Sequence, residues 1–207
     1  MQRIVCHGDS LTEGADLDVH LRWPSLLQTA LDVEVINTGI GGDSTAGMLS
    51  RFPTDVVRQK PTAVILLGGT NDFWWDLPLK SSVSNLYTMA YQAQYYDIVP
   101  LFGLPLPLDV NQAHEQYENE PEAGYEKLFS KIGRLNSRLK ALAHADDITV
   151  INFYDLFLTK AGDVRTDCYL EDGVHPNQNG HQRMAELAAS ILRSSSVLNP
   201  EPEEIFT

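Results

Sequence analysis

Short apolar runs alternate along this chain with longer segments of helical periodicity. The apolar runs cover residues 3–6, 33–37, 62–68, 97–103 and 147–152. Several of them lack a polar residue at every second position, which is typical of parallel strands that helices cover on both faces. Segments with helical spacing cover residues 24–30, 44–60, 81–95, 125–145 and 178–193. The pattern therefore predicts an α/β fold in which five parallel strands alternate with helices.

Three stretches depart from this rhythm. Pro53 predicts a break in the helix expected over residues 44–60. Residues 108–124 are acidic and read as irregular, and their place after the fourth strand makes them either a solvated connection or the rim or lid of a site. Residues 194–207 read as a flexible tail. The length of the chain suits one core, so we expect a single domain over residues 1–193, followed by that tail.

The charge and the cysteines narrow the partners and the compartment. A formal net charge of −13 leaves no cluster of Lys and Arg for phosphates, which argues against nucleic acid and anionic membrane surfaces and favours a small neutral or apolar substrate. No apolar run reaches about 20 residues, the length that a membrane-spanning helix needs. Cys6 and Cys168 are too few for a disulfide framework, and residues 2–6 already read as a core strand with no signal peptide before them. We therefore expect a cytoplasmic protein, with its oligomeric state left open.

Four glycine-containing segments carry the candidate chemistry. They are GDSLTEG at 8–14, GIGGDST at 39–45, GGTNDF at 68–73 and DGVHP at 172–176. The first three follow predicted strands, and in an open parallel sheet ligands bind beyond the carboxyl ends of the strands. Glycine N–H groups and the Asn71 amide are the parts of an oxyanion hole, while His175 and Asp172 offer a base and a carboxylate to orient it. With Ser10 as the hydroxyl nucleophile, these side chains would make a Ser-His-Asp arrangement.

In the same order, the four segments resemble the sequence blocks of the GDSL esterases and lipases, also called SGNH hydrolases. The third block, Gly-x-Asn-Asp, matches residues 69–72, and the last block, Asp-x-x-His-Pro, matches residues 172–176. Together the blocks extend from residue 8 to residue 176 and so cover most of the chain. The resemblance implies a three-layer α/β/α sandwich with a flavodoxin-like sheet and a site that uses no metal or other cofactor.

The resemblance also implies a role for each matching residue. Ser10 is the nucleophile, and its own backbone N–H is one oxyanion donor. Gly42 is the second donor, although the adjacent Gly41 fits the block as well. The remaining roles are the side-chain oxyanion donor for Asn71, the base for His175 and the orienting carboxylate for Asp172. The implied reaction is two-step acyl transfer on a carboxylic ester, such as a short acyl ester, an acetylated sugar or a lysophospholipid.

Several of these residues also have a structural interpretation. Ser10 suits the N-cap of a helix. His7 departs from the apolar or aromatic residue that family members often carry there, and we interpret this rival base as a packed residue at a strand end. We interpret His181 as a solvated helix residue. The aromatic residues after Asn71 either belong to the core or form a substrate pocket: Phe73, Trp74 and Trp75. Loop-bracing roles are expected for Asp9, Asp43 and Asp72.

Two other functions compete with the esterase interpretation. A metal-dependent phosphoesterase would need several convergent His and carboxylate ligands, of which the last block offers only one His. A non-enzymatic flavodoxin-like module would use the glycine loops to bind a phosphate or another ligand, which would leave Asp172 and His175 without a purpose.

Overall fold

Five parallel strands form one sheet. The computed structural model describes residues 2–117, 120–195 and 197. Across the sheet the order is β2-β1-β3-β4-β5, and the strands are β1 (Arg3–Gly8), β2 (Glu34–Gly39), β3 (Ala63–Leu67), β4 (Val99–Gly103) and β5 (Thr149–Ile151). Every neighbouring pair is parallel, with Cys6 of β1 opposite both Asn37 and Ile65. The five-stranded parallel sheet predicted from the apolar runs is confirmed.

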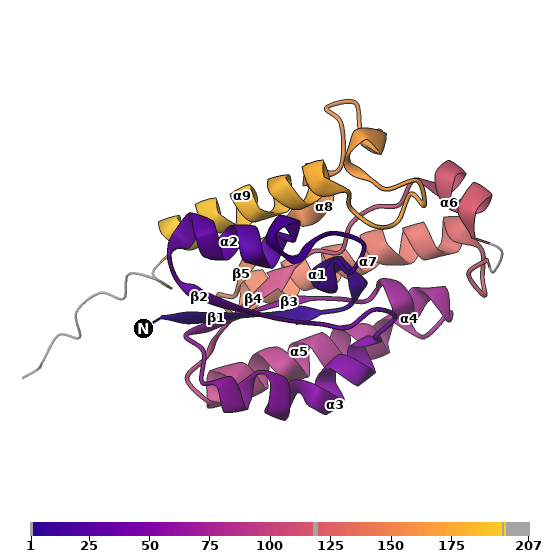
Figure 1. The fold of residues 1–207 in the computed structure, drawn as a ribbon. Helices are drawn as coiled ribbons and strands as arrows, with labels where there is room; N and C mark the ends of the chain where they lie inside the picture. The colour runs from indigo at the N-terminus through magenta and orange to yellow at the C-terminus, as the bar shows by residue number, and fades with distance from the viewer. Residues whose placement is uncertain (1, 118–119, 196, 198–207) are drawn as a thin grey trace, which may run out of the picture.

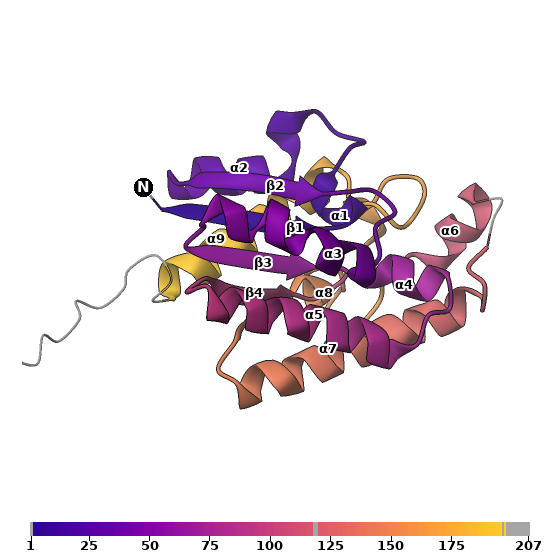
Figure 2. The ribbon, with the colours of Figure 1, turned by 90° about the horizontal axis from the view of Figure 1, so that it is seen from below.

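Helices cover both faces of this sheet and make three layers (Figure 1). In the described part of the chain the helices are α1 (Ser10–Glu13), α2 (Trp23–Leu31), α3 (Thr45–Asp55), α4 (Thr70–Trp74), α5 (Leu79–Tyr95), α6 (Val110–Gln116), α7 (Tyr125–Ala145), α8 (Phe153–Leu156) and α9 (Gln178–Ser194), with 3-10 turns at Val19–Leu21, Val57–Gln59 and Thr166–Cys168. As Figures 1 and 2 show, α2 and α9 pack together on one face, and α3 and α5 pack together on the other. The predicted α/β/α sandwich is confirmed.

The first strand shows why its residues 4–6 are all apolar. Ile4 and Cys6 are buried against α2 and α9, while Val5 between them is buried against α3 and α5. Successive side chains of a strand point to opposite faces, and helices cover both faces here. Residues 4–6 therefore each face a core, and Gly8 ends the strand at the edge where the glycine segments begin.

Pro53 does not break its helix. α3 runs through it from Thr45 to Asp55, so the prediction of a break at this proline is wrong. The proline lies in the last turn, where its missing N–H removes one hydrogen bond from a helix that is about to end. The remainder of the predicted 44–60 segment is the 3-10 turn at Val57–Gln59.

The acidic stretch after β4 is more ordered than its sequence indicates. It contains α6, whose N-cap Asp109 accepts hydrogen bonds from the N–H groups of Asn111 and Gln112 at 3.1 and 3.2 Å. The expectation of an irregular 108–124 segment is corrected for this helix, while residues 118–119 lie outside the described residues. The capping side chain directly before an apolar residue is the signal that predicts such a helix start.

The structure also bears on the predicted tail, on membrane-spanning helices and on the two cysteines. Most of the predicted 194–207 tail, namely residue 196 and residues 198–207, lies outside the described residues. In the part that is described, no helix combines the length and the apolar composition needed to cross a membrane. Cys6 and Cys168 are both buried free thiols, and a cytoplasmic location stays a prediction.

Candidate active site

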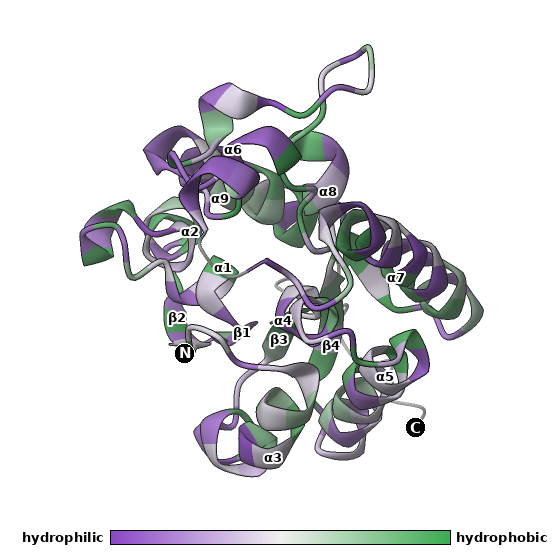
Figure 3. Cartoon of the chain, turned by 90° about the vertical axis from the view of Figure 1, so that its right-hand side faces the viewer, coloured by the Kyte–Doolittle hydropathy of each residue, from purple (hydrophilic) through white to green (hydrophobic). Residues whose placement is uncertain are grey.

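Ser10 lies at the carboxyl end of β1, as the first residue of α1. The side chain of Asp9 accepts a hydrogen bond from the Leu11 N–H at 3.0 Å, so Asp9 is the N-cap of this helix. The N-cap interpretation of Ser10 is therefore wrong, and the serine hydroxyl is not used to cap the helix. Figure 3 looks onto this end of the sheet, where α1 and α4 lie near the centre of the view.

The structure brings Ser10, His175 and Asp172 into one hydrogen-bonded row. The Ser10 Oγ lies 2.9 Å from Nε2 of His175, and Nδ1 of the same ring lies 2.6 Å from Oδ2 of Asp172. The serine is 165 residues away from the histidine along the chain. A hydroxyl, an imidazole and a carboxylate in this sequence of contacts can move the serine proton onto a base whose orientation is fixed.

A tight turn holds the carboxylate and the imidazole together. Oδ1 of Asp172 accepts hydrogen bonds from the backbone N–H groups of Val174 and His175, both at 2.9 Å. The turn requires Gly173, which has a φ of 65° and where a Cβ would lie 2.5 Å from the carbonyl oxygen of Asp109. A left-handed residue at this close approach favours glycine, and the turn leaves Oδ2 of Asp172 to face the ring.

Asp172 and His175 shift each other's pKa. Burial raises the pKa of the Asp172 carboxyl, but its hydrogen bonds with His175 and Val174 outweigh this and bring the pKa down to about 2. Burial lowers the pKa of His175, whereas the hydrogen bond to Asp172 and its negative charge raise it, and the net result is a raised pKa. The charged form of the imidazole, which would exist after proton transfer, is thus stabilised by its partner.

The two candidate glycine donors differ in whether their backbone N–H is already hydrogen-bonded. The N–H of Gly41 donates to Oε2 of Glu13 at 2.6 Å and is therefore occupied. The N–H of Gly42 makes no hydrogen bond with the described residues, and its φ of 75° turns the chain at the edge of the cavity beside Ser10. This geometry favours Gly42 over Gly41. The Ser10 N–H stands in the first turn of α1, where backbone N–H groups have no acceptor within the helix.

Asn71 lies across the same cavity, in the first turn of α4. Its Nδ2 donates one hydrogen bond to the carbonyl oxygen of Asp43 at 3.0 Å. A side-chain amide has two N–H donors, so the bond to Asp43 orients the group and leaves a second N–H for a ligand. The predicted donors Ser10, Gly42 and Asn71 therefore border one cavity of 460 Å³.

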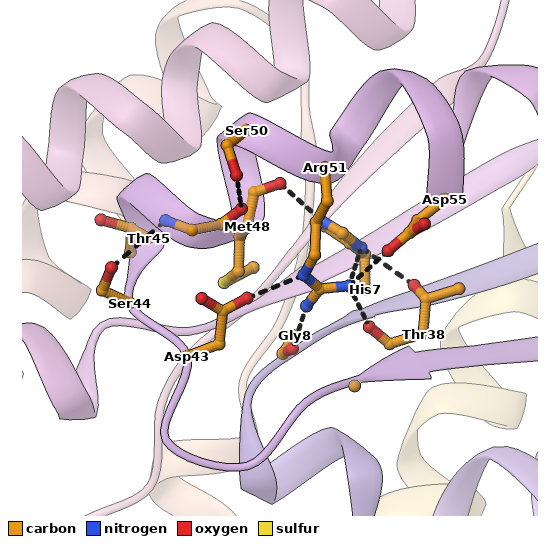
Figure 4. A network of polar contacts seen from close by, with 12 residues as sticks. His7, Gly8, Thr38, Asp43, Ser44, Thr45, Met48, Ser50, Arg51 and Asp55 are labelled. Carbon is orange, nitrogen blue, oxygen red and sulfur yellow. Dashed lines mark hydrogen bonds and ion pairs between the residues drawn. The ribbon is translucent and has the colours of Figure 1, made fainter.

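A partly buried arginine fixes the loop that carries Gly42 (Figure 4). The guanidinium of Arg51 bonds the carboxylates of Asp43 and Asp55 at 2.8 Å each, and the carbonyl oxygens of Gly8 and Thr38 at 2.8 and 2.6 Å. Gly8 stands just before the Ser10 turn, and Asp43 follows Gly42. One side chain therefore ties together the two loops that carry the backbone donors, and the loop-bracing role expected for Asp43 agrees with these contacts.

The three aromatic residues after Asn71 divide between core and cavity. Trp74 and Trp75 line the cavity, and Trp75 is 62% exposed. Phe73 is 1% exposed and packs in the core with Lys131 over its ring. The expectation of Phe73 as a pocket residue is corrected, because the short helix α4 turns successive side chains by roughly 100° and directs this ring toward α7.

Tyr117 is a site residue that the sequence did not reveal. It follows α6, lines the cavity, and donates a hydrogen bond from its hydroxyl to Oδ2 of Asp172 at 3.2 Å. The same hydroxyl lies 3.5 Å from Nδ1 of His175, and the ring packs edge-on against Trp74 with centroids 5.1 Å apart. The acidic segment after β4 therefore contributes to the rim of the cavity, which agrees with one of the two alternatives left open for it.

We expect Tyr117→Phe to lower kcat/KM about tenfold, because a hydrogen bond to a charged group contributes about 1.5–3 kcal/mol and only part of it acts on the reaction. The phenol competes with the imidazole for the same carboxylate oxygen. Without this competition Asp172 raises the pKa of His175 further, so the ascending limb of the pH–rate profile should move to higher pH. The phenylalanine keeps the ring contact with Trp74, and an unchanged limb in the variant would contradict this role.

Two other histidines take positions in the interior. His7 is fully buried: its Nε2 donates to the carbonyl oxygen of Met48 at 3.0 Å, and burial lowers its pKa to about 4. This agrees with the interpretation of His7 as a packed residue and not as the base. His181 is 1% exposed, and its Nδ1 accepts a hydrogen bond from the Trp23 N–H at 3.0 Å. The expectation of a solvated His181 is therefore wrong.

Among the described residues, no group of three or more His, Cys, Asp or Glu side chains is arranged to hold a metal ion. A metal-dependent phosphoesterase needs such a group. Asp72, near the site, instead accepts hydrogen bonds from Thr45 and Ser82.

The sequence model of the GDSL-like Lipase/Acylhydrolase family matches residues 6–183. The chain belongs to this family. The matched region includes all four glycine-containing segments, from the Ser10 turn to the turn of Asp172 and His175.

Individual members of the family support this assignment. The chain is 28% identical to an arylesterase of Vibrio mimicus over 199 residues, which are 92% of this chain and 88% of the relative. It is 29% identical to the esterase TesA of Pseudomonas aeruginosa over 193 residues, 89% of this chain and 85% of the relative. A solved G-D-S-L family protein of Desulfitobacterium hafniense DCB-2 has the same fold, with a TM-score of 0.80 and 23% identity over 93% of this chain and all of that chain.

Proposed function

We propose that this member of the GDSL family is a serine esterase that hydrolyses small carboxylic esters. The observation that carries the proposal is the row of contacts from Ser10 Oγ to His175 Nε2 at 2.9 Å and from His175 Nδ1 to Asp172 Oδ2 at 2.6 Å, beside a cavity of 460 Å³. Ester hydrolysis is also supported by the relatives, which are named an arylesterase and an esterase.

In the proposed mechanism His175 takes the proton of Ser10 as the serine oxygen attacks the ester carbonyl carbon. The N–H groups of Ser10 and Gly42 and the amide of Asn71 hold the oxyanion of the tetrahedral intermediate. His175 then gives the proton to the departing alcohol. Water repeats the cycle on the acyl-enzyme and releases the acid, while Asp172 keeps the ring in place and stabilises its charged form.

The proposed substrates are short acyl esters, with acetylated sugars and lysophospholipids as further members of the class. The cavity has Trp74 and Trp75 in its lining, which gives an apolar surface beside the reacting carbonyl. The cavity of 460 Å³ lies within the range of about 300–1,000 Å³ that is typical of small-molecule sites, which fits a small ester.

The proposal is tested by trapping its covalent intermediate. The enzyme is mixed with p-nitrophenyl acetate, quenched in acid and digested, and the acetylated peptide is identified by mass. We expect the acetyl group on Ser10 together with a burst of p-nitrophenol. Turnover without any acyl adduct on this serine, under conditions where the burst is resolved, would contradict acyl transfer through Ser10.

We expect Asn71→Ala to lower kcat by about 10²–10³ with little change in KM. The tetrahedral intermediate carries a full negative charge on the former carbonyl oxygen, whereas the bound ester carries only a partial one. A donor aimed at this oxygen therefore acts mainly in the transition state. Single-turnover acylation and KM, measured on the same preparation, separate this effect from weaker binding.

Asn85→Ala is the matched control. Its amide also makes one hydrogen bond, to Oγ1 of Thr45 at 3.0 Å, but Asn85 does not line the cavity. Both variants lose one such bond, so a similar loss of stability is expected in both, with normal acylation only in Asn85→Ala. A destabilised Asn71→Ala enzyme with normal acylation would remove Asn71 from the oxyanion hole.

The two competing functions predict different results. A metal-dependent phosphoesterase would lose its activity in a chelator and regain it with metal. A flavodoxin-like binding module would leave Ser10 unreactive in the acylation experiment. The esterase proposal predicts activity that a chelator leaves unchanged and acetylation that depends on Ser10.

A further inference from the structure

The cavity beside Ser10 has acidic residues on its surface, together with the imidazole of His175. Its lining includes the carboxylates of Glu13 and Asp16, and among the described residues that line it there is no Lys or Arg. Glu13 is held in place, because its Oε2 accepts the Gly41 N–H at 2.6 Å. Asp16 is exposed at the rim. Two fixed negative charges beside a cavity attract cations and repel anions.

Neither of the two arginines close to this region lines the cavity. Arg22 donates to the carbonyl oxygens of Leu17 and Glu13 at 2.9 and 3.1 Å and does not line the cavity. Arg51 is paired with Asp43 and Asp55 at 2.8 Å. Arg51 therefore adds no net positive charge. Arg22 keeps its charge outside the cavity lining and makes no ion pair with Asp16 or Glu13 within the described part of the chain.

The negative charge of Asp16 reaches the reacting groups. It contributes to the raised pKa of His175, after the effects of burial and of Asp172, and also to the raised pKa of Tyr117. Asp172 adds a further negative charge behind the imidazole, and its carboxyl has a pKa of about 2. Three carboxylates, those of Glu13, Asp16 and Asp172, therefore lie at the cavity or directly behind its imidazole.

Aromatic rings complete the environment for a cation. Trp74, Trp75 and Tyr117 line the same cavity as Glu13 and Asp16. A cation placed over an aromatic face is attracted by the electrons of the ring, most strongly by Trp, and quaternary ammonium groups are recognised in this way. Carboxylates alone would bind any cation, whereas carboxylates combined with aromatic rings favour one with an apolar surface.

We propose that this cavity prefers esters whose alcohol part carries a positive charge, such as a quaternary ammonium group, over neutral esters of the same shape. The inference rests on the proposed esterase function. The reaction is the same acyl transfer: the bond from the acyl carbon to the ester oxygen, or to the sulfur of a thioester, breaks, and the acyl group passes to Ser10. The cationic alcohol or thiol leaves with the proton from His175. Esters with an anionic alcohol part should be the poorest substrates.

Two substrates of the same shape test the preference. Acetylthiocholine and S-(3,3-dimethylbutyl) thioacetate differ in a quaternary nitrogen that is replaced by a quaternary carbon, so only the charge changes. At low ionic strength we expect a kcat/KM about tenfold higher for acetylthiocholine, the size that one charge contact of about 1.4 kcal/mol would give. High salt should reduce the ratio, because it shortens the screening length to a few ångströms.

The variant Asp16→Asn tests whether the charge of Asp16 causes the preference for the cationic substrate. We expect it to lower the ratio about threefold, because the charge of an exposed side chain is largely screened by solvent. Asp97→Asn is the matched control, because it removes the same charge just before β4, at the opposite end of the sheet, and its φ of 58° suits Asn. The control should leave the ratio unchanged.

Some results would contradict the substrate preference alone, and another would contradict the esterase function. Equal or faster cleavage of the neutral thioacetate, or an equal effect of Asp16→Asn and Asp97→Asn, would overturn the inference. The inference also fails if neither thioacetate is cleaved by an enzyme that still hydrolyses p-nitrophenyl acetate. Failure to cleave all three esters counts against the esterase function itself.

Discussion

Ser10→Ala is expected to lower kcat for p-nitrophenyl acetate by about 10⁶, the size of effect found when the nucleophile of a Ser-His-Asp site is removed. The hydroxyl hydrogen-bonds the ring of His175, and Asp9 caps the helix in its place. The fold therefore does not depend on this hydroxyl, and the melting temperature should stay within about 2 °C of the original enzyme.

Ser137→Ala is a suitable control for this experiment. Ser137 lies on α7, where its hydroxyl is exposed and bonds the carbonyl oxygen of Gly133 at 2.9 Å. The control should keep its full activity. An active Ser10→Ala enzyme, shown by mass to be free of the original protein, would end the account of Ser10 as the nucleophile.

Asp172→Asn is expected to lower kcat by about 10⁴ and to change the pH dependence. The amide oxygen of the variant can still accept the N–H groups of Val174 and His175, so the turn keeps its shape. The amide nitrogen would then face Nδ1 of His175, which favours the tautomer that cannot accept the serine proton at Nε2. The loss should appear in acylation, with little change in stability.

The ascending limb of the pH–rate profile should shift in a defined direction in Asp172→Asn. Only the neutral imidazole of His175 can accept a proton, so activity rises as the pH passes its pKa. In the original enzyme that pKa is raised, and the limb should lie above the ordinary histidine value of about 6.5. In the variant the contribution of Asp172 is gone while burial still lowers the pKa, so the limb should move to lower pH. Asp9 and Asp16 act on His175 in both enzymes, and an unmoved limb would contradict the pairing with Asp172.

The sequence predicted the fold well because its signals are local. An apolar run between helical segments indicates a buried parallel strand wherever it occurs, and the helix predicted over residues 125–145 has those bounds in the structure. The convergence of the first three glycine segments follows from the same pattern, since the carboxyl ends of parallel strands share one edge. The fourth segment follows no strand, so the position of His175 near Ser10 was expected from the family resemblance.

What the sequence did not reveal depends on contacts between distant segments. Tyr117 reaches Asp172 across 55 residues, and nothing near it in the chain signals this contact. His181 did carry a signal, because it lies three residues before Met184 on the apolar stripe of α9, and that face is buried. Phe73, Trp74 and Trp75 differ only in the direction that each side chain takes from α4, and this depends on the position of α7.

The central claim is that Ser10 is a nucleophile activated by His175, and labelling with a fluorophosphonate tests it most directly. The reagent phosphonylates an activated serine, and the modified peptide is identified by mass in the original enzyme and in Ser10→Ala and His175→Ala. The account predicts one adduct on Ser10, none in Ser10→Ala and a strongly slowed reaction in His175→Ala. An adduct on another residue, or labelling of Ser10 at an undiminished rate without His175, would contradict it.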